Sequence, residues 1–317
     1  MAITDIEQSA YDFMDWNAQF NHNGIPGTQY NRIIYPYVIN DSVATPTTTE
    51  FEVTPVPVNA AIQILENHTE TAQSQTVRFS ERIIETVNNS TTEGYKIGGG
   101  IRSTTSVKVK VGFFLGGSIK QSIDLAFTGE YNHSSTRSLI QSHEQLWEVI
   151  QPVIVSPYSR IVATLIIMKT QLRIPIQLSS NIRGTHFQEN SNSWFCGSSF
   201  QRYQQNNLTV LSTAAALANP IWPNKPSSFK SAGLNDSLNL IGSAYSDIGS
   251  GLYIIVRFDQ TRLPGYSGET KTWYSDQIQL RNGGILTIPN FDPTTKIFSS
   301  NGIPISPEEA EGIEFTE

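Results

Sequence analysis

One stretch of this sequence, residues 95–131, alternates between apolar and polar residues in a single phase. The phase holds through almost the whole stretch: odd-numbered positions carry nearly all of the aliphatic and aromatic side chains, and even-numbered positions carry all of the charges. Successive side chains of a β-strand point to opposite faces, so a period of two predicts long strands with one apolar and one polar face. The glycines within residues 112–117 can adopt the backbone angles of a tight turn. The stretch therefore predicts one long β-hairpin.

The composition of the two faces suits a bilayer on one side and water on the other. Each arm offers about 9–11 residues, the length of a tilted transmembrane β-strand. The residues predicted to face lipid are Ile97, Ile101, Val107, Val109, Val111, Ile119, Ile123, Leu125 and Phe127. The residues predicted to line a water-filled pore are Lys96, Arg102, Lys108, Lys110, Lys120, Asp124 and Glu130. Five positive and two negative groups give +3 per chain, which predicts an anion preference.

The tip of the predicted hairpin is also apolar, with Phe113, Phe114 and Leu115, although exposed loops are usually polar. A single hairpin cannot cross a bilayer alone, because its outer edges would leave backbone N–H and C=O groups unpaired in hydrocarbon. Insertion therefore requires several copies that close a barrel together, and we expect a homo-oligomer in the pore state. The alternative is an ordinary sandwich hairpin in a β-rich lectin or other carbohydrate-binding protein that never enters membranes.

Strand patterns bounded by Gly, Pro, Asn and Ser dominate the rest of the chain and predict an all-β protein. Residues 1–60, together with the irregular residues 184–240, form a predicted N-terminal head that binds the receptor. Residues 61–183 and 241–262 form a predicted long-strand region for pore formation and oligomerisation, with the insertion hairpin at 94–131. Residues 263–317 form predicted C-terminal strands and an acidic tail that is a candidate for proteolytic processing.

Charge and terminal sequence exclude some classes of protein. The net charge of −7 argues against a nucleic-acid partner, because such proteins need a basic surface. The single cysteine, Cys196, cannot form an internal disulfide. The N-terminus lacks the features of a signal peptide and instead predicts a helix over 4–20 with Thr4 as its N-cap. We therefore expect a chain made soluble in the producing cell, stored or released on lysis, that acts outside it on the plasma membrane of a target cell.

The sequence contains no recognisable motif for catalysis, for a cofactor or for a metal. The five histidines do not have the spacing of zinc ligands; they are His22, His68, His133, His143 and His186. Nucleophile-elbow, P-loop and dinucleotide-binding motifs are absent as well. We expect a non-enzymatic protein without a cofactor or a metal site.

Several segments, in order, resemble the epsilon-toxin/mosquitocidal-toxin branch of the aerolysin-type β-pore-forming toxins. Residues 65–73, LENHTETAQ, resemble that family's strand with a leucine, an Asn-x-Thr and a glutamine. Residues 86–96 and 128–138 resemble the strands that enter and leave the family's insertion hairpin. Residues 153–183 resemble its block of a proline, a short turn and a long strand, and residues 240–256 resemble the strand that follows.

The resemblance implies an elongated all-β fold of the aerolysin type, with a small head that contains a short helix. It also implies binding to a cell-surface receptor, assembly into a ring, and refolding of one hairpin per chain into a shared transmembrane β-barrel. Many small members of the family come from spore-forming bacteria and kill insects, so an insecticidal toxin is implied. Aromatic residues of the two irregular regions are candidates for receptor contact: Trp16, Tyr30, Tyr35, Tyr37, Trp194 and Trp222.

Overall fold

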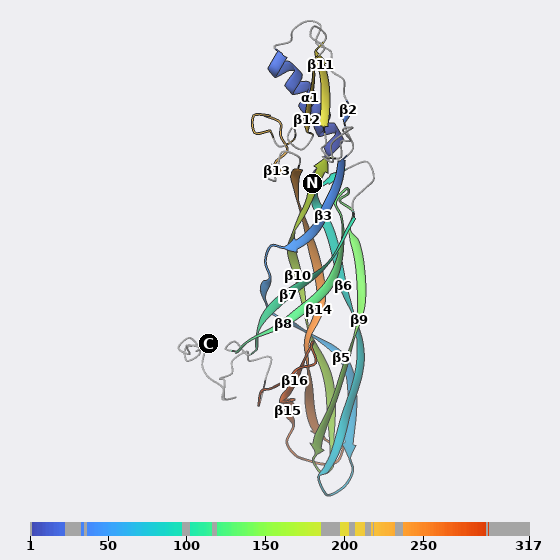
Figure 1. Cartoon of the computed structure of the whole chain (residues 1–317). Coiled ribbons are helices and arrows are strands. Elements are labelled where there is room, and N and C mark those ends of the chain that lie inside the picture. The colour runs from blue at the N-terminus through green and yellow to red at the C-terminus, as the bar shows by residue number, and fades with distance from the viewer. Residues whose placement is uncertain are drawn as a thin grey trace, which may run out of the picture.

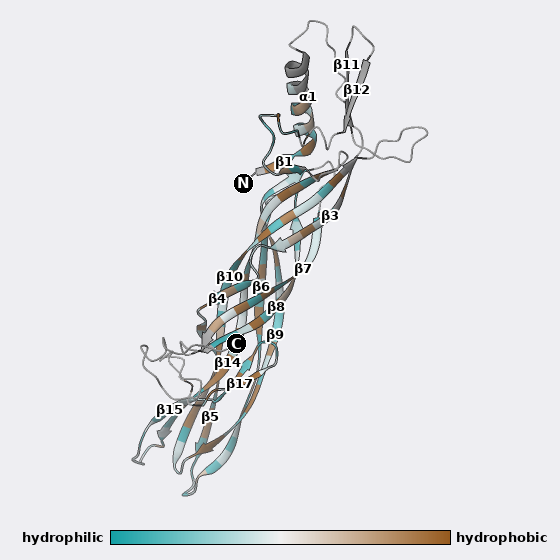
Figure 2. Ribbon diagram, turned by 60° about the vertical axis from the view of Figure 1, so that its left-hand side comes forward, coloured by the Kyte–Doolittle hydropathy of each residue, from teal (hydrophilic) through white to brown (hydrophobic). Residues whose placement is uncertain are grey.

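The computed structural model describes residues 2–22, 33–34, 37–96, 102–115, 119–184, 197–202, 207–212, 217, 219–231, 237–289 and 291. The molecule is elongated, with helix α1 (Ile6–His22) at one end and long strands along most of its length (Figure 1). Figure 2 shows apolar and polar residues alternating along these strands. The predicted all-β fold with a short N-terminal helix is confirmed.

The strands fall into three groups along the chain. Those before the hairpin are β1 (Ala2–Asp5), β2 (Ile33–Ile34), β3 (Tyr37–Pro46), β4 (Glu50–Val53), β5 (Val56–Asn67) and β6 (Gln73–Lys96). The predicted hairpin segment and the two strands that follow it comprise β7 (Arg102–Leu115), β8 (Ile119–Asn132), β9 (Leu139–Val155) and β10 (Ser159–Gly184). The remainder are β11 (Gly197–Arg202), β12 (Asn207–Ser212), β13 (Phe229–Ser231), β14 (Ser237–Arg262), β15 (Lys271–Tyr274), β16 (Gln277–Leu280) and β17 (Ile285–Thr287).

The long sheet is built around β6, β10 and β14. Strands β10 and β14 are antiparallel from Ser159↔Arg262 to Arg183↔Ser237, with a register shift after Met168. The other edge of β10 pairs with β3 towards one end and with β5 towards the other. Strand β14 also pairs with β6, which in turn pairs with β9. Strand β9 therefore forms a long edge of this sheet.

Buried apolar side chains gather in three clusters along the molecule. One lies beside α1 and contains Phe13, Tyr95 and Trp222. A second is formed by residues of β5, β6, β9, β10 and β14 and includes Trp147. A third joins β7 and β8 to the long sheet and also takes in Ile278, Ile288 and Phe291 of the C-terminal segment.

The helix begins two residues later than the sequence predicts. Asp5, not Thr4, is the cap, because Asp5 Oδ1 accepts a hydrogen bond of 3.1 Å from the backbone N–H of Gln8. Thr4 lies within β1, which pairs in parallel with the end of β6. A carboxylate in this position also interacts favourably with the positive end of the helix dipole.

The division of the chain into head and long-strand regions stays a prediction, but several segments now have a position. Strand β3 and the first part of β5, within the segment assigned to the head, pair with β10. Strand β4, from the same segment, pairs with β7. Residues 263–289 contain β15, β16 and β17, whereas the acidic tail from residue 292 onward lies outside the described residues.

The Asn-x-Thr of residues 67–69 has a structural role. Asn67 is fully buried, and its Nδ2 donates to the carbonyl oxygens of Thr71, Val155 and Ser156 at 2.8–3.1 Å. Its Oδ1 accepts from the N–H and the hydroxyl of Thr69. The side chain therefore joins the β5–β6 turn to the end of β9 and satisfies backbone groups that would otherwise be buried without partners.

Candidate membrane-insertion hairpin

Strands β7 and β8 form the hairpin that the alternation predicts. They pair from Arg102↔Asn132 to Leu115↔Ile119, so residues 112–115, which the sequence analysis assigned to the turn, continue strand β7. Strand β4 adds to β7 in parallel, from Glu50↔Lys110 to Val53↔Phe113. Among the described residues, these three strands form a sheet of their own, separate from the long sheet.

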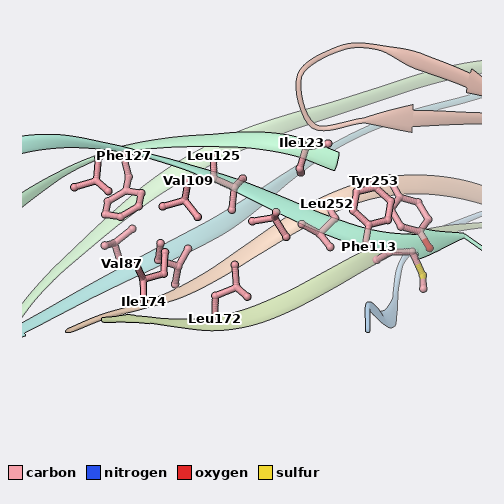
Figure 3. Close-up of a cluster of buried hydrophobic side chains, with 14 of the residues drawn as sticks. Val87, Val109, Phe113, Ile123, Leu125, Phe127, Leu172, Ile174, Leu252 and Tyr253 are labelled. Atoms are coloured by element: carbon pink, nitrogen blue, oxygen red, sulfur yellow. The ribbon is translucent and has the colours of Figure 1, made fainter. Parts of the chain in front are cut away.

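The odd-numbered face of the hairpin packs against the long sheet (Figure 3). Seven apolar side chains of this face are no more than 9% exposed: Val107, Val109, Val111, Phe113, Ile123, Leu125 and Phe127. Phe113 stacks on Tyr253 of β14, with ring centroids 5.3 Å apart and planes inclined by 18°. The face predicted to contact lipid is thus covered by protein here, and its assignment to lipid stays a prediction.

Some of the predicted lipid-facing and tip positions cannot be compared with the structure. Ile97 and Ile101 lie outside the described residues. The backbones of Phe114, Leu115 and Ile119 are in strands β7 and β8, but their side chains are outside the described set.

A few polar contacts attach the hairpin to the long sheet. The Tyr131 hydroxyl lies 2.6 Å from Ser246 Oγ, and Ser246 donates to Asn89 Oδ1. Ser103 Oγ donates to the carbonyl oxygen of Ser42 at 2.8 Å. Burial raises the pKa of Tyr131, so its hydroxyl remains neutral and able to donate. These contacts use side chains and do not extend the backbone ladder of the long sheet.

A buried histidine follows the last residue of β8. His133 is fully buried, and its Nδ1 lies 2.6 Å from the hydroxyl oxygen of Tyr95. That hydroxyl donates its one hydrogen to Ser180 Oγ. His133 Nε2 has no hydrogen-bond partner in the described part of the chain. Burial lowers the pKa of His133 to about 4. A Cβ atom on Gly94 would lie 2.1 Å from His133 O, so this close approach of β6 requires glycine.

The even-numbered face of the hairpin carries six of the seven predicted pore-lining residues, and the seventh, Lys96, is the last residue of β6. Lys110 Nζ lies 3.8 Å from Glu50, and Lys120 Nζ lies 2.8 Å from Glu52, both carboxylates of β4. The hydrogen bond to Glu52 raises the pKa of Lys120. On the same face Arg102 pairs with Glu130 at 3.6 Å, whereas Lys96 at the end of β6 pairs with Asp5 of β1 at 3.5 Å. Lys108 and Asp124 are exposed, and Glu130 is half-buried.

A buried ion pair lies beneath the hairpin. Glu85 of β6 contacts Arg281, which follows β16, with 2.6 Å between Arg281 Nη2 and Glu85 Oε2. The same carboxylate accepts from Ser250 Oγ at 2.7 Å and from the N–H of Gly251. A cavity of about 290 Å³ adjoins this pair and is also lined by Lys108 and Phe127 of the hairpin.

Two of the receptor-binding candidates, Trp16 and Trp222, have described side chains, and both pack against Phe13 of α1. Trp222 is 4% exposed and packs edge-on against Phe13, with ring centroids 5.5 Å apart. Trp16 is half-buried against the same Phe13. Tyr30, Tyr35 and Trp194 lie outside the described residues, and so does the side chain of Tyr37. The Trp222 ring is thus not presented to a ligand, and a receptor role for this set stays a prediction.

Sequence reasoning missed Glu85 and the carboxylates of β4. Glu85 occupies an inward position between Ile83 and Val87, so a charge within an apolar phase was the available signal. Glu50 and Glu52 gave no such signal, because the sequence of a four-residue strand does not reveal which other strand it pairs with. The parallel contact of β4 with β7 joins segments about 60 positions apart and depends on the fold.

The described ranges contain no group of three or more His, Cys, Asp or Glu residues placed to hold a metal ion. Within the same part of the chain, no helix is long and apolar enough to cross a membrane.

Three solved structures with a similar fold illustrate the comparison. A chain of the Cry23Aa1–Cry37Aa1 binary complex is 20% identical and has a TM-score of 0.60, covering 91% of this chain and 99% of that one. A non-toxic crystal protein from Bacillus thuringiensis is 15% identical with a TM-score of 0.63, over 84% and 100%. The β-pore-forming protein Mpp75Aa1.1 from Brevibacillus laterosporus is 15% identical with a TM-score of 0.53, over 86% and 95%. At these identities the similarity shows the fold alone.

Sequence comparison is more specific. The pesticidal crystal protein Cry15Aa of Bacillus thuringiensis subsp. thompsoni is 32% identical over 263 residues, which span 83% of this chain and 75% of that protein. The family model described as Clostridium epsilon toxin ETX/Bacillus mosquitocidal toxin MTX2 matches residues 31–272. This chain, with its elongated aerolysin-like fold, therefore belongs to the epsilon toxin/mosquitocidal toxin family, whose members are pore-forming rather than enzymatic.

Proposed function

We propose that this protein is a receptor-dependent pore-forming toxin whose β7–β8 hairpin becomes its share of a transmembrane β-barrel. The chain is made soluble in the producing cell, acts outside it, and binds a protein or glycan on the surface of a target cell. Bound copies assemble into a ring before their hairpins insert. The pesticidal relative from Bacillus thuringiensis supports an insect target.

The observation that carries this proposal is the way the hairpin is held. In the described structure, β7 and β8 pair with each other and with four residues of β4, and their contact with β6, β10 and β14 is made by side chains. Departure therefore leaves the ladders of the long strands intact. The main cost is the exposure of seven apolar side chains, roughly 1.5–3 kcal/mol each and about 10–20 kcal/mol in total. In a bilayer these apolar side chains contact lipid instead of water, which offsets the cost. A membrane therefore favours release of the hairpin from the long sheet.

Backbone hydrogen bonding explains the need for a ring. Once β7 has left β4, both outer edges of the hairpin carry unpaired N–H and C=O groups, which hydrocarbon cannot satisfy. Neighbouring hairpins supply the missing partners when enough copies close a barrel. In this arrangement the even-numbered face lines the channel, and Lys110 and Lys120 exchange Glu50 and Glu52 for water.

The test ties the hairpin to β4. In a Cys196→Ser background, Glu50→Cys/Lys110→Cys joins two exposed positions that face each other across the β4–β7 ladder. Oxidation should lower dye release from insect midgut membrane vesicles by at least about tenfold, because the hairpin cannot leave, and reduction should restore it. Binding to the vesicles should be unchanged.

The matched control links the hairpin to itself. Ser106→Cys/Thr128→Cys joins facing residues of β7 and β8 whose hydroxyl oxygens are 3.3 Å apart. This link travels with the hairpin, so the oxidised control should still release dye. Equal activity of the oxidised and reduced Glu50→Cys/Lys110→Cys variant would refute hairpin release. If the wild type binds the vesicles but neither releases dye nor forms SDS-resistant oligomers, the result would instead favour a carbohydrate-binding protein.

A further inference from the structure

One edge of β10 has a gap in its pairing, at the point where the chain leaves it to form β4. Strand β3 covers this edge as far as Thr47, whose N–H donates to the carbonyl oxygen of Pro175 at 2.9 Å. Strand β5 covers it again from Val56, which lies opposite Lys169. Between these two points the chain turns away and pairs with β7. Within the described structure, no strand pairs with residues 170–174 on this edge.

The backbone of β10 in the gap is arranged to receive a strand. Consecutive residues of a strand direct their N–H and C=O groups to opposite edges. Because Pro175 bonds to Thr47 on the β3 side, Arg173 and Gln171 direct their backbone groups to that side as well. Both residues are exposed. An open edge of this kind can add a strand by forming backbone hydrogen bonds.

The segment that contains β4 is long enough to fill the gap. Continuing the β5 ladder places residues 52–55 opposite residues 170–173. Pro55 then takes a position that faces away from β10, where the N–H that proline lacks is not needed. Residues 48–55 number eight and cross the five positions 170–174, so three remain as a loop and neither end has to move.

The side chains also match in this register. The inward residues of β10 in the gap are even-numbered, so Val53 lies beside the buried Leu172. Glu52 lies on the exposed face, opposite Arg173. An aliphatic pair and an oppositely charged pair both favour the pairing of two strands. A slip by one residue in either direction would place the Glu52 carboxylate on the apolar face instead.

In the present structure the hairpin holds β4 away from β10. Strand β4 pairs with β7, and Glu52 lies 2.8 Å from Lys120 Nζ of β8. Val53 packs against the apolar cluster that joins the hairpin to the long sheet. If the hairpin leaves, β4 loses the one ladder that it has within the described structure, and Leu172 loses the hairpin that covers it.

We propose that β4 is an exchange strand, which pairs with β7 in the present form and moves onto the open edge of β10 once the hairpin has left. This proposal rests on the proposed pore-forming function. The movement is about one sheet layer, roughly 10 Å, and Glu52 is four residues from Val56, a reach of about 13 Å. The new ladder replaces the one that β4 loses, and Val53 covers part of the face that the hairpin exposes. The exchange therefore makes return of the hairpin less favourable.

A disulfide across the new ladder tests the exchange. In a Cys196→Ser background, Glu52→Cys/Arg173→Cys joins two exposed residues and removes only exposed ion pairs. Directly opposed residues of a hydrogen-bonded pair have Cα atoms about 5.5 Å apart, within the reach of a disulfide. Under oxidising conditions, linkage within one chain should be at least about tenfold greater after incubation with insect midgut membrane vesicles than in solution.

The matched control lies on the same edge of β10. Thr45→Cys/Gln177→Cys joins exposed residues that face each other now, so it should link equally with and without vesicles and leave dye release unchanged. The exchange is overturned if Glu52→Cys/Arg173→Cys releases dye but stays unlinked, or if it links to the same extent in solution. Absence of dye release from the wild type and both reduced variants would reject the pore-forming function, and the exchange with it.

Discussion

Two regions of this molecule are buried to the same degree but are held in different ways. Ile174 of β10 and Ile123 of β8 are 0% and 2% exposed and belong to the same apolar cluster. Strand β10 pairs with β14 along its whole length and with β3 or β5 along much of its other edge. In the described structure, the hairpin pairs outside itself with the short strand β4 alone.

This difference teaches that burial alone does not identify which strands can move. Side-chain packing holds both regions, but backbone ladders bind β10 and β14 into the long sheet, and the hairpin shares no ladder with that sheet. A strand held by packing can exchange one apolar environment for another. A central strand would have to break many backbone hydrogen bonds first.

The largest expected effect concerns the buried ion pair of the long sheet. Arg281→Ala leaves the Glu85 carboxylate buried without its cation, which should lower the free energy of unfolding by about 3–5 kcal/mol. Urea unfolding measures this change. Arg173→Ala is the matched control, because it breaks an exposed pair with Asp247 and should leave the urea midpoint unchanged. Equal shifts in the two variants would contradict the difference between buried and exposed pairs.

The same deletion on the two sides of one apolar cluster tests the comparison directly. Ile174→Ala and Ile123→Ala should each remove about 2–5 kcal/mol of local stability. For Ile174 the loss should appear in global unfolding, because β10 is part of the central ladder. For Ile123 it should appear first as faster amide exchange limited to β7 and β8, together with dye release at lower protein concentration. Identical exchange patterns would mean that hairpin and sheet open as one unit.

The base of the hairpin should be sensitive to acid. The pKa of His133 is about 4 in the folded protein and near its ordinary value of 6.5 in the unfolded chain. Between these values the unfolded state binds more protons, so stability falls as the pH drops from 6.5 to 4, by about 3 kcal/mol in total. Urea unfolding of wild type and His133→Gln across this range measures the difference. His143→Gln, at an exposed position of β9, should keep the wild-type pH dependence of the unfolding free energy. If His143→Gln loses this pH dependence, its attribution to His133 is wrong.

The smallest effect on stability is expected at Lys108, where a substitution should change only the ion selectivity of the pore. This side chain is exposed on the even-numbered face, so Lys108→Glu should leave the urea midpoint unchanged. It changes the predicted charge of the channel from +3 to +1 per chain and should reduce anion preference. The reversal potential in a salt gradient measures this. A wild-type channel with clear cation selectivity would contradict the assignment of this face to the lumen.

Much of the hairpin could be predicted from the sequence, because alternation is a local property of a strand. Residues 107–111 and 123–127 alternate between buried odd and exposed even positions as predicted, and the long strand after Pro157 runs as expected over residues 159–184. The helix cap was misplaced by one residue because Thr4 belongs to β1, whose partner β6 is distant in sequence. Trp222 is buried for a similar reason, since Phe13 that covers it comes from α1.

The amino-acid sequence by itself determined that this chain forms long two-faced strands, with an apolar and a polar face alternating through the hairpin segment. The tertiary structure alone decided what covers the apolar face and which strands share a ladder. The physical reason is the separation along the sequence of the residues that interact. Side-chain alternation is fixed by neighbours along the chain, whereas register and burial depend on hydrogen bonds and contacts between segments tens of residues apart.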